Sequence, residues 1–280
     1  MRFVDLIMLS TRMFKARTSR TLLTILGMGV GISAVLFLVS FGYGLQKTLL
    51  ERITTSDSLL TLDVTEANSA AISLDSAMIE KIQSLPGVEE VSPAFQLTAQ
   101  GHLEDISADL SAIGVKPSFL KLGGYRIISG ETLKDIKPNG AVITSAVGQV
   151  FGKKDATEMI GQVITFSFFI PKDNGSNIEA ADLRGNLEKV ENNTRYEIVG
   201  VIEGEENTAY INSQSLSLND FKINKFSQAK VKCQSQQEMT GVRAAIEGEG
   251  FLVSSISDTV DQANQVFGVV QIVLLLFGII

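Results

Sequence analysis

The sequence predicts an α+β membrane protein. We expect an N-terminal transmembrane helix, an extracytoplasmic domain with a split β-α-β (ferredoxin-like) part and an inserted β-rich subdomain, and the start of a second transmembrane helix. The chain is 45% hydrophobic yet has a net charge of −7, so its apolar residues must be concentrated. Residues 21–46 and 262–280 indeed contain no charged residue. Between them, short alternating apolar segments and helical patterns recur, as in a globular domain.

We expect residues 1–20 to form a cytoplasmic amphipathic helix. Apolar residues recur there at helical spacing, and basic residues take the other side. Such a helix lies along the membrane surface. The simpler alternative is a basic flank that only fixes the topology. The apolar face comprises Phe3, Leu6, Ile7, Met13 and Phe14.

Residues 21–46 are expected to be a retained transmembrane helix. As a helix they are about 39 Å long, which exceeds the ~30 Å hydrocarbon core of a bilayer. A secretion signal is disfavoured because its apolar region is shorter and ends in a small-residue cleavage site. A dinucleotide-binding glycine loop is disfavoured because it follows a strand and opens a helix in a soluble β-α-β unit.

Gly27 and Gly31 form a G-x-x-x-G pair on one face of this helix. Small residues at that spacing let two membrane helices approach closely. Glycine is also simply common in membrane helices. The sequence leaves both interpretations open, and helix packing is the candidate role of the pair.

The charge distribution predicts the orientation. Residues 1–20 carry a net charge of +4, which leaves −11 for the rest of the chain. Positive residues beside the first helix stay in the cytoplasm. We therefore expect a cytoplasmic N-terminus with residues 47–262 outside. The acidic outer region argues against nucleic acid or anionic lipid head groups as its partner. The topology-determining residues are Arg12, Lys15, Arg17 and Arg20.

Two strand–helix–strand patterns lie at the ends of the external region. Residues 59–65 alternate like a half-buried strand, and a helix capped by Ser73 or Asp75 follows and ends at Pro86-Gly87. Strands are expected near 94–103 and 106–115. Residues 228–257 repeat the strand, helix, strand order. Two such halves folding together make a ferredoxin-like sandwich.

The segment between the halves has short apolar runs separated by turn signals, which is typical of a β-rich subdomain. Its polar stretch 171–193 is expected to be an exposed loop or a long hairpin extension. The predicted parts are the amphipathic helix 1–20, transmembrane helix 21–46, stalk and first α+β half 47–119, β-rich insertion 120–226, second half 227–258, and stalk with incomplete second membrane helix 259–280.

No enzyme motif is present in the sequence. It lacks a G-x-x-x-x-G-K-[ST] phosphate loop, a G-x-S-x-G elbow and an H-E-x-x-H motif. The single cysteine, Cys233, and the single histidine, His102, are expected to be structural. The acidic residues Glu203, Glu205 and Glu206 do not match an EF-hand spacing and are expected to form a solvated turn. We expect neither catalysis, a cofactor nor a metal.

Several motifs in this order resemble the MacB/FtsX-like family of ABC transporter permeases, which includes the lipoprotein-releasing permeases. The resemblance covers essentially the whole chain. Its motifs are "RTSRTLLTILGMGVGISAVLFLVSFGYG", "SLPGVEEVSP", "SAIGVKPSFL" with "IISGE", "NGAVITSAVGQVFG", "YEIVGVIE" and "GFLVSSISDTVDQANQVFGVVQIVLLLFGII".

The resemblance implies a protein of the bacterial cell (inner) membrane, with four membrane helices and the large external domain between the first two. It also implies a second permease copy, in a homo- or heterodimer, and a cytoplasmic ABC ATPase subunit. The lipid bilayer is a further partner, and an extracytoplasmic adaptor or substrate is a candidate one. The implied function couples ATP hydrolysis by the ATPase to movement of the external domain, for export or lipoprotein extrusion.

The resemblance leaves alternatives. One is an FtsX-like membrane scaffold that regulates a cell-wall hydrolase, and another is a membrane-anchored binding module without any ATPase. Residues 266–280 are about 22 Å long as a helix, shorter than the ~30 Å needed to cross a bilayer. We therefore expect the chain to be a fragment of a longer permease.

Overall fold

A computed structural model describes residues 18–53, 55–67, 72–171, 187–216 and 225–279. The chain divides into two compact units, which we treat separately. One contains residues 1–51 with 259–280, and the other contains residues 52–258.

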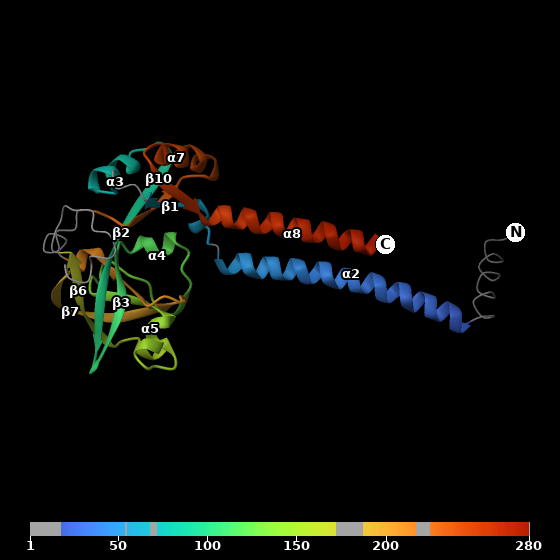
Figure 1. The fold of residues 1–280 in the computed structure, drawn as a ribbon, viewed down its shortest axis with the longest axis horizontal. Coiled ribbons are helices and arrows are strands. Elements are labelled where there is room, and N and C mark those ends of the chain that lie inside the picture. Colours follow the sequence, from blue (N-terminus) through green and yellow to red (C-terminus); the bar gives the residue numbers. More distant parts are fainter. Residues whose placement is uncertain (1–17, 54, 68–71, 172–186, 217–224, 280) are drawn as a thin grey trace. The chain divides into compact units, whose positions relative to one another are not determined.

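The described part of the first unit is helical (Figure 1). Helix α2 (Thr18–Ile53) is continuous and extends beyond the predicted membrane-spanning part 21–46 into the predicted stalk, because the "LQKTLLERI" segment continues the helical pattern. Its part Thr18–Thr48 contains an 18-residue window with a mean hydropathy of 2.5, no residue of which is buried. In the described ranges it is the one helix long and apolar enough to cross a membrane. Helix α8 (Ile256–Ile279) follows the second unit, and its Asn264 Oδ1 accepts a hydrogen bond from Gln46 Nε2 at 2.7 Å. The second membrane segment stays a prediction.

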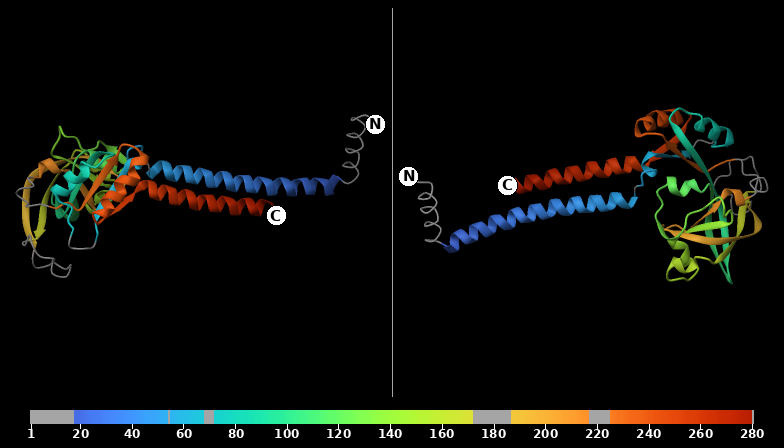
Figure 2. Two further views of the ribbon diagram at one scale, coloured as in Figure 1. Left: turned by 90° about the horizontal axis from the view of Figure 1, so that it is seen from above. Right: turned by 180° about the vertical axis from the view of Figure 1, so that it is seen from behind.

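The second unit is built on one ten-stranded sheet (Figures 1 and 2). Its order is β10-β1-β9-β2-β3-β8-β5-β7-β4, and β6 pairs with β2 and β7. The strands are β1 (Thr61–Glu66), β2 (Val88–Leu103), β3 (Ile106–Val115), β4 (Ile127–Gly130), β5 (Gly140–Thr144), β6 (Val163–Pro171), β7 (Leu187–Ile202), β8 (Thr208–Asn212), β9 (Gln228–Cys233) and β10 (Phe251–Ser255). The remaining helices are α3 (Ser76–Gln83), α4 (Ser118–Leu122), α5 (Ser145–Val150) and α7 (Gln236–Gly248), with short 3-10 helices η1 (Ser58–Leu60), η2 (Ala156–Met159) and η3 (Ser213–Ser215).

Strands β10, β1, β9 and β2 pair antiparallel, so the two distant strand–helix–strand segments interleave in one sheet. Helices α3 and α7 lie together over this part (Figure 1) and bury Ile82, Val242 and Ile246 in a common core. Of the two caps that the sequence allowed for α3, the structure selects Asp75, whose side chain accepts from Met78 N at 2.9 Å.

The long strand β2 belongs both to the part of the sheet that contains β10, β1 and β9 and to the part that contains β6. Residues 88–94 pair with β9, and residues 98–102 pair with β6. The predicted strand 94–103 was too short, because pairing with β9 extends it back to Val88. Through β2 the two parts form one sheet, and the division at 120–226 stays a prediction.

The polar stretch predicted as a loop or hairpin extension is a hairpin as far as it is described. Strand β7 begins at Leu187, and residues 187–192 pair with β6. Polar sequence is compatible with a strand here because the alternate side chains of Glu191, Asn193 and Arg195 are exposed. Residues 172–186 lie outside the described residues.

Candidate functional site

Histidine and cysteine are common at reactive centres, but His102 and Cys233 both lie in surroundings typical of structural residues. His102 lies between two hydroxyls, with Nδ1 2.8 Å from Ser107 Oγ and Nε2 2.9 Å from Ser167 Oγ. Cys233 is fully buried, and burial raises the pKa of its thiol to about 11. Over the ranges that the structure describes, no group of three or more His, Cys, Asp or Glu side chains could hold a metal ion.

Networks of side-chain hydrogen bonds and ion pairs lie where the chain enters the sheet unit and where it leaves it. We name residues 55–58 with their partners the entry junction. Thr55 N donates to Ser58 Oγ at 2.8 Å, and Ser58 N donates to Thr55 Oγ1 at 3.1 Å. Hydroxyl side chains three residues apart can bond each other's backbone in this way. Residues 55–58 therefore form a hydrogen-bonded turn ahead of β1.

Asp57 ties the entry junction to two elements. Its carboxylate lies 2.9 Å from Lys121 Nζ on α4 and 3.1 Å from Lys232 Nζ on β9. Lys232 also pairs with Glu89 at 2.9 Å. Hydrogen bonds from Lys121 and then Lys232 hold the pKa of Asp57 below its ordinary value. The hydrogen bonds that Lys232 donates to Glu89 and then to Asp57 raise the pKa of Lys232.

A second lysine fixes α4 on the sheet. The side chain of Lys230 is 8% exposed and its Nζ lies 2.5 Å from Asp63 Oδ1. The same ammonium lies 5.1 Å from the ring centre of Phe119 and 5.8 Å from that of Tyr125. Because a buried ammonium needs both a counter-ion and favourable neighbours, this arrangement holds α4 and the segment after it in place.

We name Ser255, Asp258 and Arg243 the exit junction. Ser255 N donates to Asp258 Oδ2 at 3.1 Å, and Asp258 N donates to Ser255 Oγ at 3.2 Å. These reciprocal bonds form a capping box at the start of α8. Arg243 Nη2 on α7 adds bonds of 2.7 and 3.0 Å to the two carboxylate oxygens of Asp258. The first turn of α8 is thereby joined to α7.

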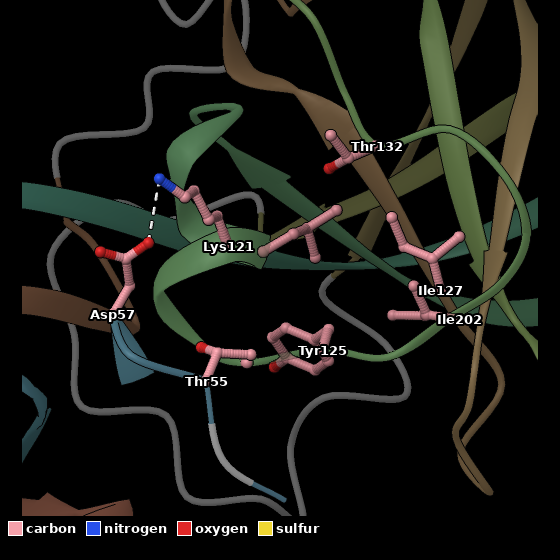
Figure 3. Close-up of a pocket in the computed structure, with 9 residues that line it drawn as sticks. Thr55, Asp57, Lys121, Tyr125, Ile127, Thr132 and Ile202 are labelled. Carbon is pink, nitrogen blue, oxygen red and sulfur yellow. Dashed lines mark ion pairs between the residues drawn. The ribbon is translucent and has the colours of Figure 1, made fainter. Parts of the chain in front are cut away.

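A pocket of about 270 Å³ adjoins the entry junction (Figure 3). Lys121 and Asp57 form an ion pair on one side of it, and Ile127, Ile202 and Thr132 lie on the other. The ring of Tyr125 is positioned by Tyr210, whose hydroxyl donates to Tyr125 Oη at 3.2 Å. The lining residues are Thr55, Asp57, Leu120, Lys121, Gly124, Tyr125, Ile127, Thr132 and Ile202.

The structure describes only some of the sequence-predicted site residues. Gly27 and Gly31 lie on exposed α2, and a Cβ added at either meets nothing within 4 Å. Arg20 is exposed on the same helix, and Glu203 lies 3.5 Å from Arg126 at the surface. The other predicted residues lie outside the described ranges: Phe3, Leu6, Ile7, Arg12, Met13, Phe14, Lys15 and Arg17.

Neither junction was predicted from the sequence. A signal for the exit junction was available, because "SISD" before an apolar run has the spacing of a capping box. No local signal marks the partners of Asp57, since Lys121 and Lys232 reach it only through the tertiary fold.

Comparisons with known proteins agree on one family. The family model described as the MacB-like periplasmic core domain matches residues 21–249. A macrolide export ATP-binding/permease protein MacB from Shewanella oneidensis is 25% identical over 179 residues, covering 60% of this chain and 27% of that protein. The protein of the same name from Hahella chejuensis is 27% identical over 157 residues, covering 52% and 24%. This chain thus matches about a quarter of the length of these relatives.

The fold is similar to a solved structure. The periplasmic region of MacB from Actinobacillus actinomycetemcomitans matches with a TM-score of 0.50 at 13% identity, covering 74% of this chain and 94% of that one. At this identity the match concerns the fold alone.

Proposed function

The chain belongs to the MacB-like periplasmic core domain family, and from this premise we propose that it is the permease part of an ABC transporter that moves its external domain at the expense of ATP. The ATP is hydrolysed by a cytoplasmic ABC ATPase, either separate or fused. The relatives named above combine ATP-binding and permease functions in their names, which supports such a partner. The work performed is export or lipoprotein extrusion.

We propose the topology that the charge pattern predicts. The amphipathic segment 1–20 lies on the cytoplasmic face of the inner membrane, α2 crosses it, and residues 47–262 are extracytoplasmic. The long unburied apolar helix and the +4 charge at its start support this orientation. A second permease copy packs against the Gly27 and Gly31 face, which is open in this chain.

The observation that carries the coupling proposal is the pair of junctions. A displacement at the end of α2 must pass through residues 55–58, which are tied by Asp57 to α4 and β9. A displacement at the start of α8 must act on Asp258, which is tied to α7. Helices attached through such bonds move the domain with them, whereas helices attached through free linkers do not.

The test uses the full-length permease with its ATPase in lipid nanodiscs. Spin labels at Asp105→Cys, at the exposed turn after β2, report the distance between the external domains of two copies. We expect ATP to shift this distance in the otherwise wild-type protein. In Asp57→Ala/Asp258→Ala the shift should shrink while ATP hydrolysis continues. Lys134→Gln, which removes an exposed ion pair with Glu131, is the matched control. An ATP-independent distance in the wild type contradicts the coupling function.

The FtsX-like scaffold is not favoured, because the curated relatives named above are MacB proteins and the family model is that of the MacB-like domain. An extracytoplasmic adaptor or substrate remains a proposed partner. We also keep the division of the external unit into an inserted part, 120–226, between two α+β halves, since interleaving of β1, β2, β9 and β10 supports it.

A further inference from the structure

We propose that the pocket between α4, the β4 segment and the entry junction binds one unbranched acyl chain with an anionic head group. The proposal does not depend on coupling to an ATPase, because it rests on the shape and chemistry of the sheet unit alone.

The walls of the pocket suit an aliphatic chain. Leu120, Ile127 and Ile202 contribute aliphatic surface, and Tyr125 contributes a ring that Tyr210 holds in place. The volume, about 270 Å³, lies slightly below the ~300–1,000 Å³ of typical small-molecule pockets. A single chain fits this volume better than a peptide or a polycyclic molecule. Ile127 is 43% exposed, so a ligand that covers it removes apolar surface from water.

Although the outer region is acidic overall, an ion pair places the cation of Lys121 beside the pocket (Figure 3), where it can turn to a ligand. The side chain of Lys121 is 71% exposed, and its partner Asp57 is bound at the same time by Lys232. If Lys121 turns to a ligand anion, Asp57 keeps a counter-ion 3.1 Å away, and no buried charge is left unpaired. A cationic head group has no such vacant partner, since Asp57 already has two.

Thr132 supplies a second polar contact. Its Oγ1 is buried from solvent and has no hydrogen-bond partner among the described residues. Such a group costs free energy unless something bonds to it. A carboxylate or ester oxygen of a chain lying along Ile127 can accept its hydrogen. The pocket thus has apolar walls and two polar groups, one charged and one neutral, as in an amphiphile site.

The test is photo-crosslinking of the full chain in phosphatidylcholine nanodiscs. The probe is decanoate with a diazirine in its chain, and peptide mass spectrometry locates the adduct. We expect adducts within residues 120–133, and competition by unlabelled decanoate but not by acetate. Lysophosphatidylglycerol and an N-acylated peptide as competitors distinguish a lipid source of the chain from a protein-bound one.

Matched variants test the two halves of the site. Ile127→Trp fills the pocket and should reduce crosslinking at least about tenfold, whereas Ile128→Trp, at the adjacent exposed position outside the lining, should not. Lys121→Met should weaken competition by decanoate about tenfold, the loss of one charge-assisted hydrogen bond, and leave competition by decanol unchanged. Lys116→Met is its control.

Three results overturn the proposal. They are adducts outside the pocket, crosslinking in Ile127→Trp equal to that of the wild type, and competition by decyltrimethylammonium as strong as that by decanoate. The Lys121 variant keeps the test valid if the tryptophan variant folds poorly, since this side chain lies at the surface.

Discussion

Arg243 Nη2 lies 2.7 Å from Asp258 Oδ2, so that a residue in the middle of α7 holds the first turn of α8. The same carboxylate accepts the backbone N–H of Ser255. Asp258 therefore caps one helix and pairs with another. Burial opposes ionisation of Asp258, but the hydrogen bonds from Arg243 and Ser255 outweigh it and lower its pKa.

The exit junction predicts a local stability effect. Asp258→Ala removes the capping box and the partner of Arg243, and should weaken the start of α8 by about 1–2 kcal/mol. Faster hydrogen exchange of the amides at 255–260 measures it. Asp261→Ala, an exposed acid one turn further along α8, is the control and should leave exchange unchanged. Equal exchange in the two variants contradicts a structural role of the junction.

The entry junction predicts a pH dependence. Because hydrogen bonds from Lys121 and Lys232 lower the pKa of folded Asp57, its stabilisation is present above the unfolded pKa of about 4. The stabilisation is lost as pH falls through the lower, folded pKa. The unfolding free energy of the full chain should therefore decline below about pH 4, and Asp57→Asn should make that decline shallower. Lys121→Gln should also make the decline shallower, but by a smaller amount, since Lys232 remains bound to Asp57. An unchanged slope in Asp57→Asn means that the junction contributes no stability.

Local patterns predicted the order of the elements well, because helix period, strand alternation and Pro-Gly turns are properties of short segments. The contacts of Lys230 show what they cannot supply. Asp63 is 167 positions away from it, and the two meet only because β1 pairs with β9. The length of β2 was underestimated for the same reason, since Val88 becomes a strand residue by pairing with β9. The pocket could not be predicted, as its lining comes from segments spread between Thr55 and Ile202.

Replacing glycine by alanine should have opposite effects on stability at Gly114 and at Gly241. A Cβ at Gly114 would lie 2.1 Å from the ring of Phe95, so Gly114→Ala should destabilise the sheet unit by about 1–3 kcal/mol. Gly241 lies on the exposed side of α7 with nothing within 4 Å, so Gly241→Ala should stabilise by up to about 1 kcal/mol. Thermal unfolding of the full chain compares them. The same sign for both substitutions contradicts the packing seen around β3.

The proposed orientation can be tested with a cysteine probe at Asp105. This residue is exposed at the turn between β2 and β3, whereas Asn192 Nδ2 is engaged by Tyr196 Oη and makes a poorer probe. The buried native Cys233 should react little. A membrane-impermeant maleimide, admitted past any outer membrane, should label Asp105→Cys in intact cells. Labelling that requires lysis of the inner membrane contradicts an extracytoplasmic domain.

The last prediction decides between the two interpretations of Gly27 and Gly31. Both lie on the same face of α2, and neither has a neighbouring atom that a Cβ would meet, so the face is free to pack against a second copy. Gly31→Ile should then lower self-association of the permease in bilayers, measured by energy transfer between labelled copies, by about threefold or more. Gly29→Ile is the matched control, because residues two apart on a helix face different directions and a Cβ at Gly29 also meets nothing within 4 Å. Equal loss in both variants would indicate a general effect of bulk on the helix. No loss in either would indicate that these glycines have no packing role, as expected if glycine is merely common in membrane helices.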